Sequence, residues 1–135
     1  MLRYVVVSLV GGILFGVMDA AINANALAQR LFAVYRPIAR TSIDAPVGIV
    51  IDLVYGFALA GIYLLLFPSL PGSAGLVKGL AFGVLIWFLR VAMKAASDWV
   101  MFQIPGTTLV YALGAGLLEM IVLGMLFGLT LHPAR

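Results

Sequence analysis

The stretch from Leu76 to Pro105 reads LVKGLAFGVLIWFLRVAMKAASDWVMFQIP and has the character of one long apolar helix. It contains no proline before its last residue, so no helix breaker interrupts it. Its first part is apolar enough to cross a bilayer, and its later part carries Arg90, Lys94 and Asp98. Residues four apart lie on the same face of a helix. We therefore predict a long membrane-spanning helix with a polar stripe along one side.

A second copy of this pattern precedes it in the chain. LVGGILFGV at Leu9–Val17 and LVKGLAFGV at Leu76–Val84 share leucine, valine, glycine and phenylalanine in register, 67 positions apart. The same offset carries Asp52 onto Glu119, and the chain has five acidic residues in all. Short matches of abundant glycine, leucine and valine can arise by chance, but a matched acidic pair is harder to explain in that way. The sequence therefore predicts an internal duplication.

The composition indicates an integral membrane protein that forms a single domain over residues 1–135. The chain is 64% hydrophobic and 10% charged, whereas a soluble domain is about 25% charged. Four apolar segments are long enough for a hydrocarbon core that takes about 20 helical residues to cross. We expect an all-α, polytopic fold of two tandem helical hairpins, a parallel internal repeat with halves at about 3–67 and 70–131. The spans are expected to start near Arg3, Val47, Leu76 and Thr108.

The first and third helices are expected to extend beyond the bilayer. The first begins near Arg3 and meets no proline before Pro37, so at about 1.5 Å per residue it outruns the membrane. Its second part, INANALAQRLFAVYR, has the pattern of a helix that emerges into the interface and can bend there. The apolar start followed by Ala26–Ala28 resembles a secretory signal, but Asp19 inside the run would be unusual for one. We interpret the segment as a retained first span.

The charges near the span ends favour one orientation. An even number of spans leaves both termini on the same side, and the positive-inside rule places the loops richer in lysine and arginine in the cytoplasm. We therefore expect the first and third loops to be cytoplasmic, in a bacterial cytoplasmic (inner) membrane. The residues counted on that side are Arg30, Arg36 and Arg40, with Arg90 and Lys94 if they reach the surface, against Arg3, Lys78 and Arg135 on the other.

Small residues mark the helix faces that are expected to pack. Glycines spaced by four let helix backbones approach closely in lipid, where close packing rather than hydrophobicity drives association. Their occurrence at matching places in both repeats favours contacts inside a four-helix bundle, and a dimer face is the alternative. The residues concerned are Gly12, Gly16, Gly79, Gly83, Gly124 and Gly128.

Polar residues inside the spans form the candidate site. When the second hairpin is folded about Pro105, Glu119 lies at the depth of Arg90. The duplication then places Asp52 at the depth of Asn23, where it lacks a matched cation. The predicted cluster consists of Asp19, Asn23, Asp52, Arg90, Lys94 and Glu119.

Two interpretations of this cluster stay open. A charge at the centre of a membrane helix costs about 2.5–3.5 kcal/mol on insertion scales, so such residues normally have partners. As structural groups they would bond to one another and fix how the helices pack. As functional groups they would form a proton or ion pathway, or a site for a polar headgroup.

The composition argues against several classes of function. No cysteine is present, which excludes disulfides, thiol catalysis and iron–sulfur ligation by this chain. The single histidine, His132, cannot form a bis-histidine haem site or a histidine-rich zinc site, and we expect no metal and no cofactor. The formal net charge of +3 comes from scattered basic residues, so we expect no nucleic-acid partner.

The sequence shows no nucleotide-binding loop and no nucleophile paired with a base, so an enzyme is not the favoured interpretation. The first expectation is an accessory, scaffold or assembly subunit that packs against itself or a larger membrane complex. The alternative is a small oligomeric permease or channel for protons, ions or a small polar solute, using Asp52, Glu119 and Arg90. A third hypothesis is an intramembrane lipid-modifying enzyme. Membrane lipid is an expected partner in each case, and a homo-oligomer or a larger complex in the first two.

Overall fold

The computed structural model describes residues 1–132, and every regular element in that range is a helix. Four helical segments there are long and apolar enough to cross a membrane, which confirms the all-α class and the four apolar helices of the prediction. The long segments are α1 (Leu2–Ala24), α3 (Ala45–Leu66), α4 to α5 (Gly75–Met101) and α6 (Gly106–Thr130), and the shorter elements are α2 (Ala26–Leu31) and η1 (Phe32–Ile38).

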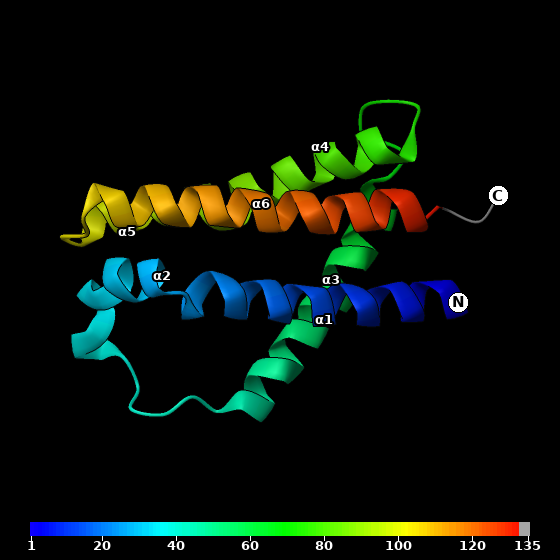
Figure 1. Cartoon of the computed structure of the whole chain (residues 1–135). Coiled ribbons are helices and arrows are strands. Elements are labelled where there is room, and N and C mark those ends of the chain that lie inside the picture. The colour runs from blue at the N-terminus through cyan, green and yellow to red at the C-terminus, as the bar shows by residue number, and fades with distance from the viewer. Residues whose placement is uncertain (133–135) are drawn as a thin grey trace.

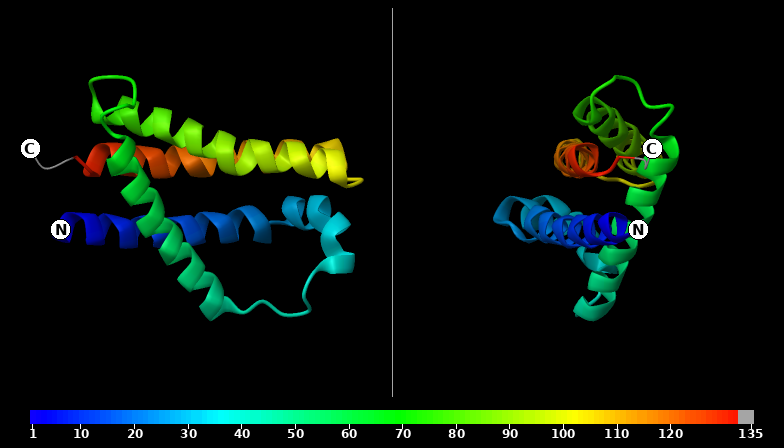
Figure 2. Two further views of the ribbon diagram at one scale, coloured as in Figure 1. Left: turned by 180° about the vertical axis from the view of Figure 1, so that it is seen from behind. Right: turned by 90° about the vertical axis from the view of Figure 1, so that its right-hand side faces the viewer.

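The four long segments form two pairs that lie against each other (Figure 1, Figure 2). α1 packs against α3, and α4 with α5 packs along α6, while α1 and α6 make most of the contact between the pairs. α3 crosses α1 on a steep slant, so its start points away from the second pair and its end meets it. The start of α1 and the end of α6 lie at the same end of the bundle, as an even number of crossings requires.

Glycines bring the backbones of α1 and α3 into direct contact where they cross. A Cβ added at Gly56 would lie 2.3 Å from the carbonyl oxygen of Ser8. One added at Gly12 would lie 2.8 Å from the Cα of Leu53. These positions leave no room for any side chain, so the two helices are held together by backbone contact.

The second pair uses a longer run of glycines along α4 and α6. A Cβ at Gly79 would lie 2.2 Å from the carbonyl oxygen of Gly124, and a Cβ at Gly124 would lie 2.2 Å from that of Gly79. Gly75 and Gly128 repeat this reciprocal contact one turn further along, at 2.3 and 2.4 Å. The glycines of this run therefore face each other inside the bundle.

An aromatic core joins the two pairs where α3 ends. Tyr63 of α3 is fully buried, and its ring centroid lies 5.2 Å from that of Phe82 in α4 and 6.1 Å from that of Phe127 in α6. Next to this core, the Nζ of Lys78 donates to the carbonyl oxygens of Phe67 and Leu70, both at 2.7 Å. These two carbonyls follow α3, so Lys78 binds the α3–α4 loop to α4.

The first long helix is interrupted at Asn25, within the segment where the sequence allows a bend. Asn25 has an extended backbone, with φ −72° and ψ 157°. Its Nδ2 donates to the carbonyl oxygens of Ala21 and Ile22, and its Oδ1 accepts from the backbone N–H of Ala28. Asparagine competes with the helical backbone for hydrogen bonds in this way, so the α-helix stops here and not at the later proline.

The third span is continuous, as predicted, but it contains one π-helical turn, η2 (Phe88–Ala92), between α4 and α5. A π turn inserts one residue into a helix, and such turns occur frequently at functional sites. Arg90 lies at the centre of this turn. The π turn therefore lies at the position where Arg90 places a charge inside this span.

Candidate functional site

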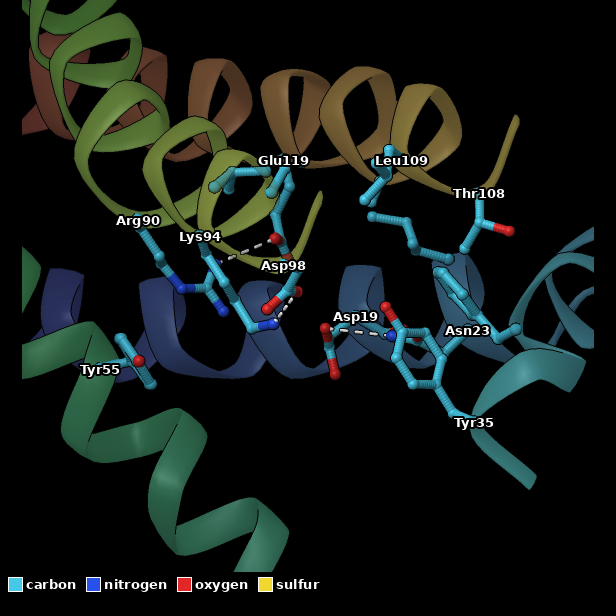
Figure 3. Close-up of a pocket in the computed structure, with 16 residues that line it drawn as sticks. Asp19, Asn23, Tyr35, Tyr55, Arg90, Lys94, Asp98, Thr108, Leu109 and Glu119 are labelled. Carbon is cyan, nitrogen blue, oxygen red and sulfur yellow. Dashed lines mark hydrogen bonds and ion pairs between the residues drawn. The ribbon is translucent and has the colours of Figure 1, made fainter. Parts of the chain in front are cut away.

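An open groove of about 800 Å³ runs between α1 and the second helix pair. Residues from α1, η1, α3, η2, α5 and α6 line it, so both halves of the chain contribute. Figure 3 shows Asp19, Asn23 and Tyr35 in one part of the groove and Arg90 and Lys94 in another. The charged and polar lining residues are Asp19, Asn23, Tyr35, Tyr55, Arg90, Lys94, Asp98, Thr108 and Glu119.

Arg90 and Glu119 form an ion pair across the second helix pair. The Nη1 of Arg90 donates to the Oε2 of Glu119 at 3.3 Å, and so joins the two residues that the folded hairpin places at one depth. The side chain of Glu119 is 4% exposed, whereas that of Arg90 is 30% exposed. The other carboxylate oxygen of Glu119, Oε1, is buried and receives no hydrogen bond from residues 1–132. The floor of the groove therefore holds a buried carboxylate with one bonded oxygen and one that can still accept.

The same guanidinium contacts the first helix pair. Its Cζ lies 4.7 Å from the ring centroid of Phe15 in α1 and 4.9 Å from that of Tyr55 in α3. A cation over an aromatic face gains about 0.5–2 kcal/mol. Arg90 thus contacts each of the other three spans.

Lys94 and Asp98 pair with each other on α5, one helical turn apart, and Lys94 forms no ion pair with Glu119. The side chain of Lys94 is 71% exposed and that of Asp98 is 14% exposed. An exposed pair at this spacing contributes about 0.3–0.5 kcal/mol. Because the two charges offset each other, the pair adds little net charge to the groove.

Asp19 has a neutral partner. The Nδ2 of Asn23 donates to the backbone oxygen of Asp19 at 2.8 Å and to its Oδ1 at 3.2 Å. Within residues 1–132 the Asp19 carboxylate makes no ion pair. Asp19 is therefore a groove-lining carboxylate whose charge is not balanced by a bonded cation.

Asp52 and Asn23 line the same crevice but form no hydrogen bond with each other. The Asp52 carboxylate packs on α1 at Gly16, where an added Cβ would lie 2.6 Å from Oδ2. Because α1 and α3 cross on a slant near Gly12, they diverge before they reach the depth of Asn23. This crevice, of about 840 Å³, lies between α1 and α3, and Asp19 and Asn23 line both it and the groove. Asp52 has no ion pair among the described residues.

Three hydrogen bonds that the sequence did not reveal hold the region of α2 against α6. The hydroxyl of Tyr111 donates to the carbonyl oxygen of Ile22 at 2.7 Å and accepts from the Nδ2 of Asn25 at 2.8 Å. The Oγ1 of Thr108 donates to the carbonyl oxygen of Leu31 at 2.8 Å. These bonds fix the segment that carries the aromatic residues of η1. No local signal could have found them, because the partners are far apart in the sequence.

Comparison of the chain with protein-family models, with characterised proteins and with solved structures finds no significant match. The fold and the groove define its class, an integral membrane protein with four apolar helices and a polar groove between its halves. The groove presents carboxylates, a guanidinium and aromatic rings within apolar walls, a combination of groups that can bind a charged solute.

Proposed function

We propose that this protein is the protomer of a small permease that passes protons or a small cation through the groove. The observation that supports this most is the state of Glu119. Its carboxylate is 4% exposed, lines an open groove, and has one oxygen without a hydrogen bond from residues 1–132. A buried acceptor without a donor is costly, which favours an occupant that enters from the groove.

The openness of the groove supports passage over a purely structural role. A structural cluster would be closed, with each charge bonded to another. Arg90 uses one of its five N–H donors within residues 1–132, and it lines a space of about 800 Å³. Asp52 and Asp19 line the neighbouring crevice, on the α3 side of α1. We assign Glu119, Arg90 and Asp52 to the path, with Asp19 between them.

The proposed assembly is an oligomer of this chain in a bacterial cytoplasmic membrane. Four spans seldom enclose a pathway alone, so a second copy would cover the open side of the groove. We propose that the halves at about 3–67 and 70–131 derive from one duplicated hairpin, with Asp52 corresponding to Glu119. The first and third loops are proposed to face the cytoplasm, with α2 and α5 extending beyond the bilayer on that side.

Flux into proteoliposomes tests this function. An internal pH dye reports protons, and radiolabelled tetraethylammonium reports a small cation that does not cross lipid unaided. Glu119→Gln keeps the shape of the side chain and removes its charge, so it should reduce flux at least tenfold. Asp44→Asn is the matched control, because Asp44 caps the exposed start of α3 and asparagine caps a helix equally well. Flux of both probes no faster than in empty vesicles would exclude the permease.

A second candidate, the accessory or scaffold subunit, is favoured by the outer face of α3. Its side chains there are at least half exposed, and the start of the helix points away from the second pair. Such a face can contact a partner helix as well as acyl chains. The residues concerned are Val47, Val50, Ile51 and Val54. If this function holds, Val50→Trp changes the size of the native complex in membranes, and neither flux probe is transported.

A further inference from the structure

The groove and the adjoining crevice contain more negative than positive charge. The two cations are each already paired with a carboxylate, Arg90 with Glu119 and Lys94 with Asp98. Asp19, which lines both spaces, is bonded by the neutral amide of Asn23. Asp52 in the crevice has no ion pair within residues 1–132. The unbalanced charge is therefore negative, and it lies on Asp19 of α1 and Asp52 of α3.

Aromatic rings line the part of the groove that holds Asp19. Phe32 is the centre of this group, with ring centroids 6.1 Å from Tyr35 and 5.7 Å from Tyr111. Phe32 and Tyr35 both line the groove, and Figure 3 shows Tyr35 beside Asn23 and Asp19. The face of an aromatic ring attracts a cation, and it also packs against apolar carbon. This wall can contact both parts of an organic cation.

Glu119 provides the second, independent sign of a ligand. Its side chain is 96% buried, and its Oε1 receives no hydrogen bond from residues 1–132. It lines the same groove as Asp19. A donor that reaches Oε1 from the groove would supply the hydrogen bond that this oxygen lacks.

We propose that the groove binds a primary organic ammonium ion, with its nitrogen at Asp19 and its carbon skeleton along Phe32 and Tyr35. This assignment rests on the proposed function only in taking the groove as the ligand site. It names the class of solute and does not depend on whether the solute crosses the membrane.

The size of the groove matches an organic ligand and not a bare metal ion. Its volume of about 800 Å³ lies within the range of small-molecule pockets, about 300–1,000 Å³. Ca²⁺ takes six to eight oxygen ligands, and transition metals take clustered histidine, cysteine or carboxylate groups. Within residues 1–132 no three such side chains come close enough to hold one metal ion. The walls are also largely apolar, which favours a ligand with a hydrocarbon part.

An organic anion of the same size fits the groove less well. Arg90 and Lys94 could attract it, but each already has a bonded carboxylate. A bound anion would also lie near Asp19, whose unpaired charge would repel it. The sign of the unpaired charge therefore selects a cation.

Three ligands of one shape test the proposal by isothermal titration calorimetry on the purified full chain in detergent. 2-Phenylethylammonium is the cation, 2-phenylethanol its neutral analogue and 3-phenylpropionate its anionic analogue. The cation should bind at least tenfold more tightly than either analogue. Asp19→Asn should weaken cation binding at least tenfold, and Tyr35→Leu should weaken it about threefold or more through the lost ring face. Asp44→Asn should leave it unchanged, because Asp44 lies outside the groove.

Equal binding of the three ligands, or full binding by Asp19→Asn, would overturn the ammonium site. Circular dichroism of each variant shows whether it is folded. If Asp19→Asn does not fold, Tyr35→Leu provides the test. Binding of the cation without flux in proteoliposomes would support the site and reject the permease. Proton flux without cation binding would reject the site and leave the permease in place.

Discussion

The guanidinium carbon of Arg90 lies 4.7 Å from the centre of the Phe15 ring. This charged group of the second helix pair therefore packs against an aromatic ring of the first pair. The same guanidinium bonds Glu119 of α6 and lies over Tyr55 of α3. One residue therefore connects the two halves and also lines the groove between them. Movement of the halves relative to each other would change these contacts, so ligand binding in the groove can be coupled to helix packing.

Replacing Arg90 by methionine should lower the free energy of unfolding by about 3–5 kcal/mol, because it leaves the buried Glu119 without its cation. The double variant Arg90→Met/Glu119→Leu should recover most of this loss, since no charge then remains buried. Unfolding in mixed detergent micelles by titration with dodecyl sulfate measures both. A double variant no more stable than Arg90→Met would show that the cation is not what stabilises Glu119.

Gly79→Ala should destabilise the protein by about 1–3 kcal/mol, because its Cβ would lie 2.2 Å from the carbonyl oxygen of Gly124. The helices α4 and α6 would have to separate to admit the methyl group. Gly114→Ala is the matched control, since nothing lies within 4 Å of a Cβ at that exposed position of α6. It should be neutral or stabilising by up to about 1 kcal/mol, because alanine favours helix over glycine. Equal losses in the two variants would mean that close contact is not the cause.

The class of fold could be predicted from the sequence because hydropathy alone dictates it. A chain this apolar can satisfy its backbone hydrogen bonds in lipid only as helices, and Pro68 and Pro105 lie in the turns between the later spans. The depth of Glu119 relative to Arg90 also follows from the sequence. Their helices are joined by a short turn at Pro105 and lie side by side in antiparallel directions. Helix periodicity is then enough to locate one residue opposite another.

The arrangement of the first pair could not be predicted in the same way. Asp52 does not bond Asn23 because α1 and α3 cross on a slant, and the angle is set by Gly56 against Ser8. The sequence pattern singled out Gly12 and Gly16, and it missed Gly56, which has no matching glycine in the other half. A crossing angle depends on contacts between helices, which periodicity within one helix does not report.

Asn25→Ala should cost about 1–2 kcal/mol of stability, because it removes the cap of α2 and the hydrogen bonds to the end of α1. It also removes a bond to Tyr111, so η1 should be held less firmly and ligand affinity in the groove should fall. Gln29→Ala is the control, because Gln29 is exposed and makes one long bond of 3.3 Å. Thermal unfolding followed by circular dichroism compares the two. A Gln29→Ala loss as large as that of Asn25→Ala would contradict the capping role.

Lys78→Met should lower stability by about 2–3 kcal/mol and loosen the loop between α3 and α4. Lys78 is 9% exposed, and its ammonium donates to the carbonyl oxygens of Phe67 and Leu70 while it lies 4.7 Å from the Phe67 ring. Methionine fills the same space but leaves both carbonyls without a donor, and a hydrogen bond to a charged group contributes about 1.5–3 kcal/mol net of water. Hydrogen exchange at the amides of residues 69–74 should therefore become faster.

Lys94→Met provides the comparison, because it removes the same charge from a lysine that is 71% exposed. Its ion pair with Asp98 contributes little, so the change in stability should stay within about 0.5 kcal/mol, and exchange in the α3–α4 loop should not change. If both lysine variants lose stability equally, and amide exchange at residues 69–74 is equally fast in the two, the loop is not held by the ammonium of Lys78. Lys78→Arg separates charge from shape, since its planar guanidinium keeps the charge but cannot place one nitrogen between the two carbonyls in the same way.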